Sequence, residues 1–310
     1  MIVRVLGSAA GGGVPQWNCA CPNCTRARRG EAPVRTQSSI AISADGTRWA
    51  VVNVSGDVAR QLAQTPALWP HELRENPFDA VLLTDANVDH VCGLGELRQN
   101  PGPLVIVSSG ATKQLLEGER AYERFTRAPH RWIERIEEKI VGGLEIEMID
   151  VPGLLPGYAG RTATPGAVVA YVVRDPAAKT QATIAPVFSE LDQRLFDAVS
   201  RSDLVLLDGT FYSDDELRAF GLKAKSAREL GHAPVGGPGG SLERIAGLRN
   251  RRVFVHVNNT NPMLDRFSDA YAAVLASGCE VAVDGWQAEV ALRTALQYGD
   301  NGGEPGALCL

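Results

Sequence analysis

Short runs of β-branched and aliphatic residues recur along this 310-residue chain, and turn-forming residues separate them. They predict strands at residues 2–7, 38–43, 48–55, 78–84, 103–108, 144–150, 167–173, 203–208, 252–257 and 279–284. Segments with helical spacing alternate with many of them, at residues 57–64, 110–118, 189–200, 213–221, 241–248 and 268–277. Several of these begin at a Ser or Asp suited to an N-cap. The alternation predicts a mixed α/β fold.

No low-complexity linker divides the chain, so we predict one domain that spans residues 1–310. The Gly- and Pro-rich stretch 151–166 is interpreted as a long surface loop within it. Hydrophobic residues make up 45% of the chain and charged residues 22%, a composition that can bury a sizeable core.

The formal net charge of -5 argues against a nucleic-acid partner, because such partners usually require a basic face. No apolar run approaches the roughly 18 residues of a membrane-spanning helix. The apolar start of the chain is also too short for the core of a signal peptide. We therefore expect a cytoplasmic protein that binds neither nucleic acid nor membrane.

Three cysteines lie close together in the segment 17–24. Cys19, Cys21 and Cys24 can reach one ion from a tight loop, and a tetrahedral Zn²⁺ then needs one further ligand. The alternative is three unrelated buried thiols. Such clustering in a reducing compartment favours a structural zinc whose fourth ligand is a distant histidine.

Polar residues alternate in the segment that follows the predicted strand 78–84. Asp85, Asn87 and Asp89 would share one side of an extended loop, and His90 comes next. Asp and His are good ligands for Zn, Mn or Fe, whereas Asn is a weak one. The alternative is a polar turn that caps a helix beginning near Val91.

Three more chemically active side chains lie at or near predicted strand ends or in turns. Asp208 ends one strand, His232 lies in a Gly-rich turn, and His256 lies within the strand 252–257. Ligand sites of layered α/β proteins commonly form where strand ends converge, so these residues and the loop 85–90 are candidates for one site. The glycine loop 7–16 lacks the ending of a P-loop and is interpreted as the lining of a cavity.

These motifs resemble the metallo-β-lactamase fold superfamily, whose metal loop typically reads HxHxDH, and within it the pyrroloquinoline quinone biosynthesis protein B family. The resemblance rests on the segments GSAAGGGVPQWNCACPNC, LTDANVDHVCGL, LLDGTF with DDEL, GHAPVGGPGGSL, HVNNTNP and EVAVDGW. It covers nearly the whole chain except about residues 110–185, where PGLLPGYAG replaces the family's usual Tyr-Ser loop. It implies a four-layer αββα sandwich with the site at the sandwich edge.

The resemblance also implies the ligands. The family lacks the first two histidines of the superfamily loop, as this chain does, so a dinuclear zinc hydrolase is not expected. Asp89, His90, Asp208 and His232 would then form a mononuclear site with two histidines and carboxylates. Such a set suits Fe²⁺ or another divalent metal.

Two further assignments follow from the same resemblance. Asp85 and Asn87 are expected to contact substrate or a bound water as part of the catalytic site. Related proteins with the cysteine loop carry a structural zinc histidine where this chain has Asn259. We therefore favour His256 as the fourth ligand of the cysteine zinc. The alternative stays open that His256 lines the active site, as a histidine at this point does in the superfamily.

The family is associated with oxidation of a tyrosine-derived ring during formation of the quinone cofactor. The resemblance therefore predicts a non-haem iron oxygenase or hydroxylase, whose partners are O₂ and a small aromatic substrate derived from an amino acid. Two alternatives stay open: a metal-dependent hydrolase, and a non-catalytic carrier or export partner of the quinone. The sequence also leaves open whether the chain forms a homodimer.

Overall fold

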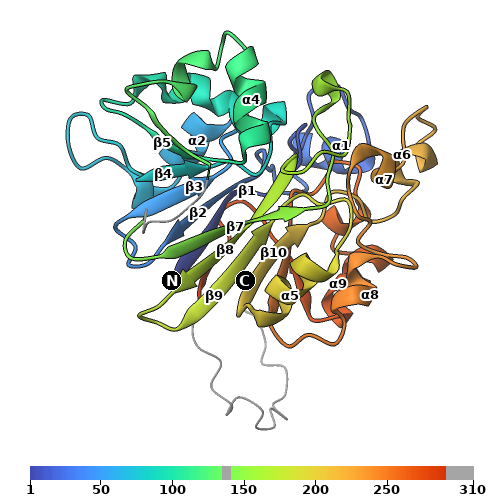
Figure 1. The fold of residues 1–310 in the computed structure, drawn as a ribbon. Coiled ribbons are helices and arrows are strands. Elements are labelled where there is room, and N and C mark those ends of the chain that lie inside the picture. The colour runs from blue at the N-terminus through green and yellow to red at the C-terminus, as the bar shows by residue number, and fades with distance from the viewer. Residues whose placement is uncertain (135–140, 291–310) are drawn as a thin grey trace.

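Two β-sheets face each other in the computed structural model, which describes residues 1–134 and 141–290 (Figure 1). The strands of the first sheet are Ile2–Gly7 (β1), Ser39–Ser43 (β2), Trp49–Val52 (β3), Ala80–Leu82 (β4), Val105–Val107 (β5), Arg131–Ile133 (β6) and Gln287–Glu289 (β13). Those of the second are Glu145–Val151 (β7), Val168–Asp175 (β8), Thr180–Ala185 (β9), Leu204–Asp208 (β10), Arg251–Val255 (β11) and Cys279–Val281 (β12). Their orders are β13-β1-β2-β3-β4-β5-β6 and β12-β11-β10-β9-β8-β7.

Helices cover the outer side of each sheet. The α-helices are Pro22–Arg28 (α1), Val58–Ala63 (α2), Val88–Val91 (α3), Gly110–Gly118 (α4), Gln193–Arg201 (α5), Glu216–Ala219 (α6), Ala227–Leu230 (α7), Ser241–Ile245 (α8) and Asp269–Ala276 (α9). The 3₁₀ helices are Pro66–Leu68 (η1), Cys92–Gln99 (η2), Glu123–Thr126 (η3), Gly157–Ala159 (η4) and Pro262–Leu264 (η5). In Figure 1, α2 and α4 lie over the first sheet, and α5, α8 and α9 lie over the second.

Alternation along the buried strands explains these layers. In β4, Leu82 packs into the core between the sheets, while its neighbour Val81 packs under the helices. In β10, Leu206 packs into the central core, and its neighbour Leu207 packs under the helices of the second sheet. A strand buried on both faces reads as a continuous apolar run, as these do. The four-layer αββα sandwich that the resemblance implies is confirmed.

The carboxyl ends of the central strands bring together segments that are far apart in the sequence. β3, β4 and β5 run parallel to one another in the first sheet, and β9 to β12 do so in the second. The loop after β1 joins the two sheets, because Ala9 forms β-bridges with both Gln37 and Val257. The loop after β4 and the ends of β10 and β11 therefore meet at one edge of the sandwich.

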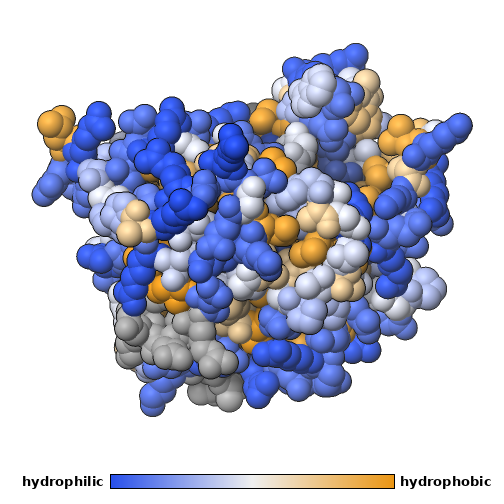
Figure 2. Space-filling model, turned by 45° about the horizontal axis from the view of Figure 1, so that its top comes forward, coloured by the Kyte–Doolittle hydropathy of each residue, from blue (hydrophilic) through white to orange (hydrophobic). Residues whose placement is uncertain are grey.

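Two features of the exterior bear on partners. Within the described residues, no helix is both long enough and apolar enough to cross a membrane. On the face drawn in Figure 2, hydrophobic side chains form separate small areas in a largely hydrophilic surface. That face presents no broad apolar patch of the kind that marks a large interface.

Candidate metal centre

The His90 ring is held by a buried carboxylate, Asp85. Asp85 lies in the loop after β4 and His90 in α3; both are fully buried, and His90 Nδ1 lies 2.8 Å from Asp85 Oδ2. Thr84 donates a hydrogen bond to the same oxygen, and the backbone and side-chain amides of Asn87 donate to Oδ1. Every acceptor position of Asp85 is thus used, so this carboxylate orients the histidine.

This arrangement corrects the expectation that Asp85 contacts substrate or a bound water, because its carboxylate is fully buried and does not line the cavity. Asn87 does line the cavity, as expected of a residue that contacts substrate or water. The capping alternative is not what the structure shows: Asn87 precedes α3, but its side chain makes no cap hydrogen bond to the helix and bonds to Asp85.

A second carboxylate and histidine come from the second sheet. Asp208 ends β10 and is fully buried, and His232 Nδ1 lies 2.8 Å from its Oδ2. The amide of Phe188 donates to the same oxygen, and Thr210 donates to Oδ1 through both its amide and its hydroxyl. Asp208, which the sequence analysis expects as a ligand, therefore already accepts four hydrogen bonds and orients His232.

His256 reaches the same place from the end of β11. The strand ends at Val255, and His256 adopts a φ of 56°, so the chain leaves the extended conformation at this residue. Its Nδ1 lies 2.8 Å from the hydroxyl of Thr210, whose proton goes to Asp208. We assign the Nδ1–H tautomer to His256 from this network, which leaves a lone pair on Nε2.

Ring nitrogens converge on Asp89. Its Oδ2 lies 3.6 Å from His90 Nε2 and 3.4 Å from His256 Nε2. The His256 ring centroid lies 5.0 Å from that of His90 and 5.6 Å from that of His232. Within residues 1–134 and 141–290, neither the His90 nor the His256 Nε2 atom has a hydrogen-bond partner, although both atoms are buried. Buried lone pairs without partners are unfavourable, and a bound cation would satisfy both.

The donor set fits a bound metal ion. Ligand atoms of Asp89, His90 and His256 lie within 4.8 Å of one another, and so do those of Asp208, His232 and His256. The two groups share His256, so the three imidazoles lie beside one another between the Asp89 and Asp208 carboxylates. Such nitrogen and oxygen donors suit Fe²⁺ and Zn²⁺.

The electrostatics of the cluster also require positive charge. Burial by itself would raise the pKa of Asp85 and Asp89 and lower that of His90. The attraction between carboxylates and histidine outweighs burial, so the pKa of both carboxyls falls and that of His90 rises to about 9. A proton on His90 or a bound cation meets this requirement, and a metal would displace that proton.

A cavity of about 250 Å³ opens onto this cluster. Gly11 and Gly12 line it, which confirms the interpretation of the glycine loop. A Cβ on Gly11 would lie 3.1 Å from Asp89 Oδ2, so a side chain there would press on the carboxylate. The residues that line the cavity are Ala10, Gly11, Gly12, Asn87, Asp89, Leu154, Leu155, Arg161, Val187, Thr210, Phe211, Leu230, Gly231, His232, His256 and Asn258.

The stretch 151–166 is more than the surface loop that the sequence predicts. Leu154, Leu155 and Arg161 face the cavity, and the Tyr158 hydroxyl donates a hydrogen bond of 2.8 Å to Ala86 O in the metal loop. The segment therefore forms one wall of the site. Sequence reasoning misses Arg161, Thr210 and the apolar wall residues, which include Leu154, Leu155 and Phe211. Of these, Thr210 and Phe211 had a local signal, since both follow Asp208 in LLDGTF.

The cysteines form a second, separate cluster. The sulfurs of Cys19, Cys21 and Cys24 lie within 4.8 Å of one another. The terminal amide of Asn259 lies 3.1, 3.5 and 3.4 Å from these sulfurs. Burial raises the pKa of the Cys24 thiol to about 11, so a bound cation would be needed to keep it deprotonated at neutral pH.

The expectation that His256 is the fourth ligand of the cysteine cluster is wrong. His256 is held by Thr210 against the other two histidines, and Asn259 occupies the place beside the sulfurs. The physical reason is the positive φ of His256, which turns the chain so that residues three apart face different clusters.

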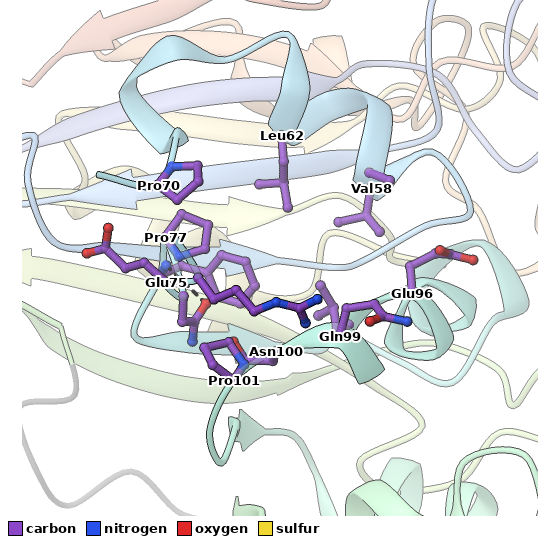
Figure 3. A pocket seen from close by; sticks show the side chains of 14 residues that line it. Val58, Leu62, Pro70, Glu75, Pro77, Glu96, Gln99, Asn100 and Pro101 are labelled. Carbon is purple, nitrogen blue, oxygen red and sulfur yellow. Dashed lines mark hydrogen bonds between the residues drawn. The ribbon is translucent and has the colours of Figure 1, made fainter. Parts of the chain in front are cut away.

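A larger cavity, of about 430 Å³, lies away from these clusters (Figure 3). Residues from α2, from the segment 70–78 and from the segment 96–101 line it, and Figure 3 shows Val58 and Leu62 extending into it from the helix. None of the site residues predicted from the sequence lines this cavity. It lacks a convergent set of metal-ligating groups, so the smaller cavity is the candidate site.

Comparisons with known proteins agree with this geometry. Residues 48–257 match the family described as beta-lactamase superfamily domain. The chain is 38% identical over 301 residues to coenzyme PQQ synthesis protein B of Methylococcus capsulatus, covering 92% of this chain and 98% of that protein.

Similar solved structures agree with these sequence matches. The crystal structure of Zn²⁺-bound PqqB from Methylobacterium extorquens superposes with a TM-score of 0.86 at 34% identity, covering 93% of this chain and 100% of that one. A diphosphatase of the PhnP family reaches a TM-score of 0.63 at 18% identity, covering 93% and 96%, which shows a common fold alone.

Proposed function

Because the chain belongs to the coenzyme PQQ synthesis protein B family within the beta-lactamase superfamily, we propose that it is a mononuclear, iron-dependent oxygenase acting on a tyrosine-derived aromatic precursor in PQQ or related biosynthesis. The observation that supports this most is the pair of buried Nε2 atoms, of His90 and His256, that have no partner among the described residues and face Asp89. The zinc-bound relative supports metal binding by this family.

Each side chain has a distinct task in this proposal. His90, His232, His256 and Asp89 would hold the ion, while buried acceptors at each Nδ1 keep the Nε2 lone pairs aimed at it. When bound, Fe²⁺ would supply the one-electron chemistry that lets O₂ react with an aromatic ring.

The cavity walls would bind and orient the substrate. Leu154, Leu155 and Phe211 are apolar and exclude water from the ring, and Asn87 and Asn258 offer amides to its hydroxyl groups. A hydroxylation replaces one ring C–H by C–OH. One atom of O₂ enters the product and the other leaves as water, so two electrons and two protons must come from a reductant such as ascorbate.

Oxygen incorporation tests the proposal. Protein purified without O₂ is loaded with Fe²⁺ and given ¹⁸O₂, ascorbate and either tyrosine or dihydroxyphenylalanine, and products are weighed by mass spectrometry. We expect a product heavier by one ¹⁸O atom, and at least a 100-fold loss of rate in His256→Ala. The matched control His71→Ala changes an exposed histidine outside the cluster and should keep the wild-type rate. If the iron-loaded wild type incorporates no label with either compound, the proposal fails.

A metal-dependent hydrolase is the second candidate, because Zn²⁺ accepts the same three imidazoles. Hydrolysis of bis(p-nitrophenyl) phosphate that depends on added zinc or manganese and is lost in His256→Ala, without O₂ consumption, would support it. A carrier of the quinone would instead bind that ligand equally well in wild type and His90→Ala.

A further inference from the structure

Arg161 is a cation built into the wall of the candidate metal cavity. It follows η4 and lines the same cavity as Asp89, His232 and His256. Its Nη1 donates a hydrogen bond of 3.2 Å to the oxygen of Leu230, the last residue of α7, two residues before His232. On the other side it rests on Gly157, where an added Cβ would lie 3.3 Å from Nη2. The guanidinium is therefore held between the loop and the end of α7.

The charge of Arg161 has no counter-ion in the protein that the structure describes. Arg174 pairs with Glu147 and Arg218 with Asp215, but no described carboxylate forms an ion pair with Arg161. A guanidinium has five N–H donors, and the bond to Leu230 uses one of them. A fixed cation with open donors beside a cavity is arranged to receive an anionic group from a ligand.

We propose that Arg161 determines specificity by binding a carboxylate of the aromatic substrate, which places the ring against the metal cluster. This inference rests on one part of the proposed function, namely that the aromatic substrate binds in this cavity. A carboxylate matches the two parallel donors of a guanidinium. The apolar walls formed by Leu154, Leu155 and Phe211 then accommodate the ring. Arg161 belongs to the stretch in which this chain departs from its family's pattern, so the assignment concerns this chain in particular.

Calorimetric titration of the zinc-loaded protein tests the proposal, because zinc prevents turnover. The probes are L-dihydroxyphenylalanine, its carboxamide, and phenyl phosphate. The wild type should bind the carboxylate at least 10-fold more tightly than the carboxamide. In Arg161→Met this preference should vanish, and in Arg161→Lys part of it should remain. The control Arg60→Met alters an exposed arginine of α2 and should behave as wild type.

Several results would overturn the proposal. The first is that Arg161→Met still binds the carboxylate more tightly than the carboxamide. The second is that the wild type binds neither amino-acid probe. The third is that the wild type prefers phenyl phosphate to the carboxylate and that this preference depends on Arg161. Zinc content is measured in every variant, so that loss of the metal is not mistaken for loss of recognition. Binding without a carboxylate preference that depends on Arg161 would overturn this inference and leave ¹⁸O incorporation unaffected, whereas intact recognition without incorporation would overturn only the oxygenase.

Discussion

Thr210 connects two histidines of the candidate metal centre through one hydroxyl group. The hydroxyl donates to Asp208, which holds His232, and it accepts from His256. Thr210→Val removes both bonds, so the His256 ring is no longer held in its orientation. We expect the affinity for Zn²⁺, measured by competition with a chromophoric chelator, to fall about 10- to 100-fold.

The control for this change is Thr162→Val, at an exposed threonine of the loop beside the cavity. It should bind zinc as the wild type does. Unfolding of the metal-free proteins shows whether Thr210→Val is folded. A folded Thr210→Val with wild-type zinc affinity would show that the hydroxyl does not position His256.

Glu216 is a buried carboxyl group near the cavity wall. It accepts hydrogen bonds from Thr260 and from the amide of Tyr212, and Thr260 in turn accepts from Asn258, which lines the cavity. Burial raises the pKa of Glu216 to about 7, from 4.5 in the unfolded chain. Because the pKa of the folded state is the higher one, its stabilising contribution is complete below pH 4.5 and is lost as the pH rises through 7.

Glu216→Gln cannot ionise and should lack this dependence. Relative to the variant, the wild type should lose on the order of 3 kcal/mol of unfolding free energy between pH 5 and pH 8. Urea denaturation of both proteins at intervals of one pH unit measures the difference. Parallel stability curves for the two proteins would contradict the raised pKa.

The sequence could not predict which of His256 and Asn259 lies at which cluster. Both lie in the motif HVNNTNP, and both residue types occur at metal sites, so the motif predicts that metals are near. Which residue meets which cluster depends on the φ of 56° at His256 and on its bond to Thr210. Neither the turn nor the distant partner can be predicted from the local residues.

The 3₁₀ helix η2 packs so closely on the segment after β3 that residue 93 must be glycine. A Cβ on Gly93 would lie 2.3 Å from Ser55 O, whereas a Cβ on Gly95 would meet nothing within 4 Å. The same segment anchors the metal loop, because the Val54 amide donates to His90 O at 2.8 Å.

We therefore expect Gly93→Ala to lower the free energy of unfolding by about 1–3 kcal/mol, because backbone atoms must move apart. Gly95→Ala, in the same helix, is the matched control and should be neutral or slightly stabilising. Chemical denaturation of the three proteins measures both changes. Equal effects of the two substitutions would contradict the close packing at Gly93.

Every strand and helix that the sequence predicts is present, with bounds shifted by a few residues at the ends. The sequence does not predict β6, β9 or β13. The residues of β9, TQATIA, carry no strong strand signal, and this strand is held by antiparallel pairing with β8 and parallel pairing with β10. The pairing with β10 lies outside any local window, and such distant partners are one reason why periodicity misses a strand.

At the scale of the whole molecule, the candidate centre joins the two sheets. Asp89 and His90 follow β4 of the first sheet, whereas His256 follows β11 of the second, and both sheets share one central core. The cysteine cluster is built from other residues, those of the segment 19–24 and Asn259. A substitution in the histidine cluster should therefore remove its metal without removing the metal of the cysteine cluster.

The metal content of single variants tests whether the protein has two separate metal centres. Wild type, Cys21→Ala and His256→Ala are purified without O₂ in the presence of Fe²⁺ and Zn²⁺, and their metals are counted by elemental mass spectrometry. We expect that Cys21→Ala loses zinc and keeps iron, and that His256→Ala loses iron and keeps zinc. A wild type that holds zinc alone and takes up no second metal, or a His256→Ala variant that loses the zinc and keeps the iron, would contradict it.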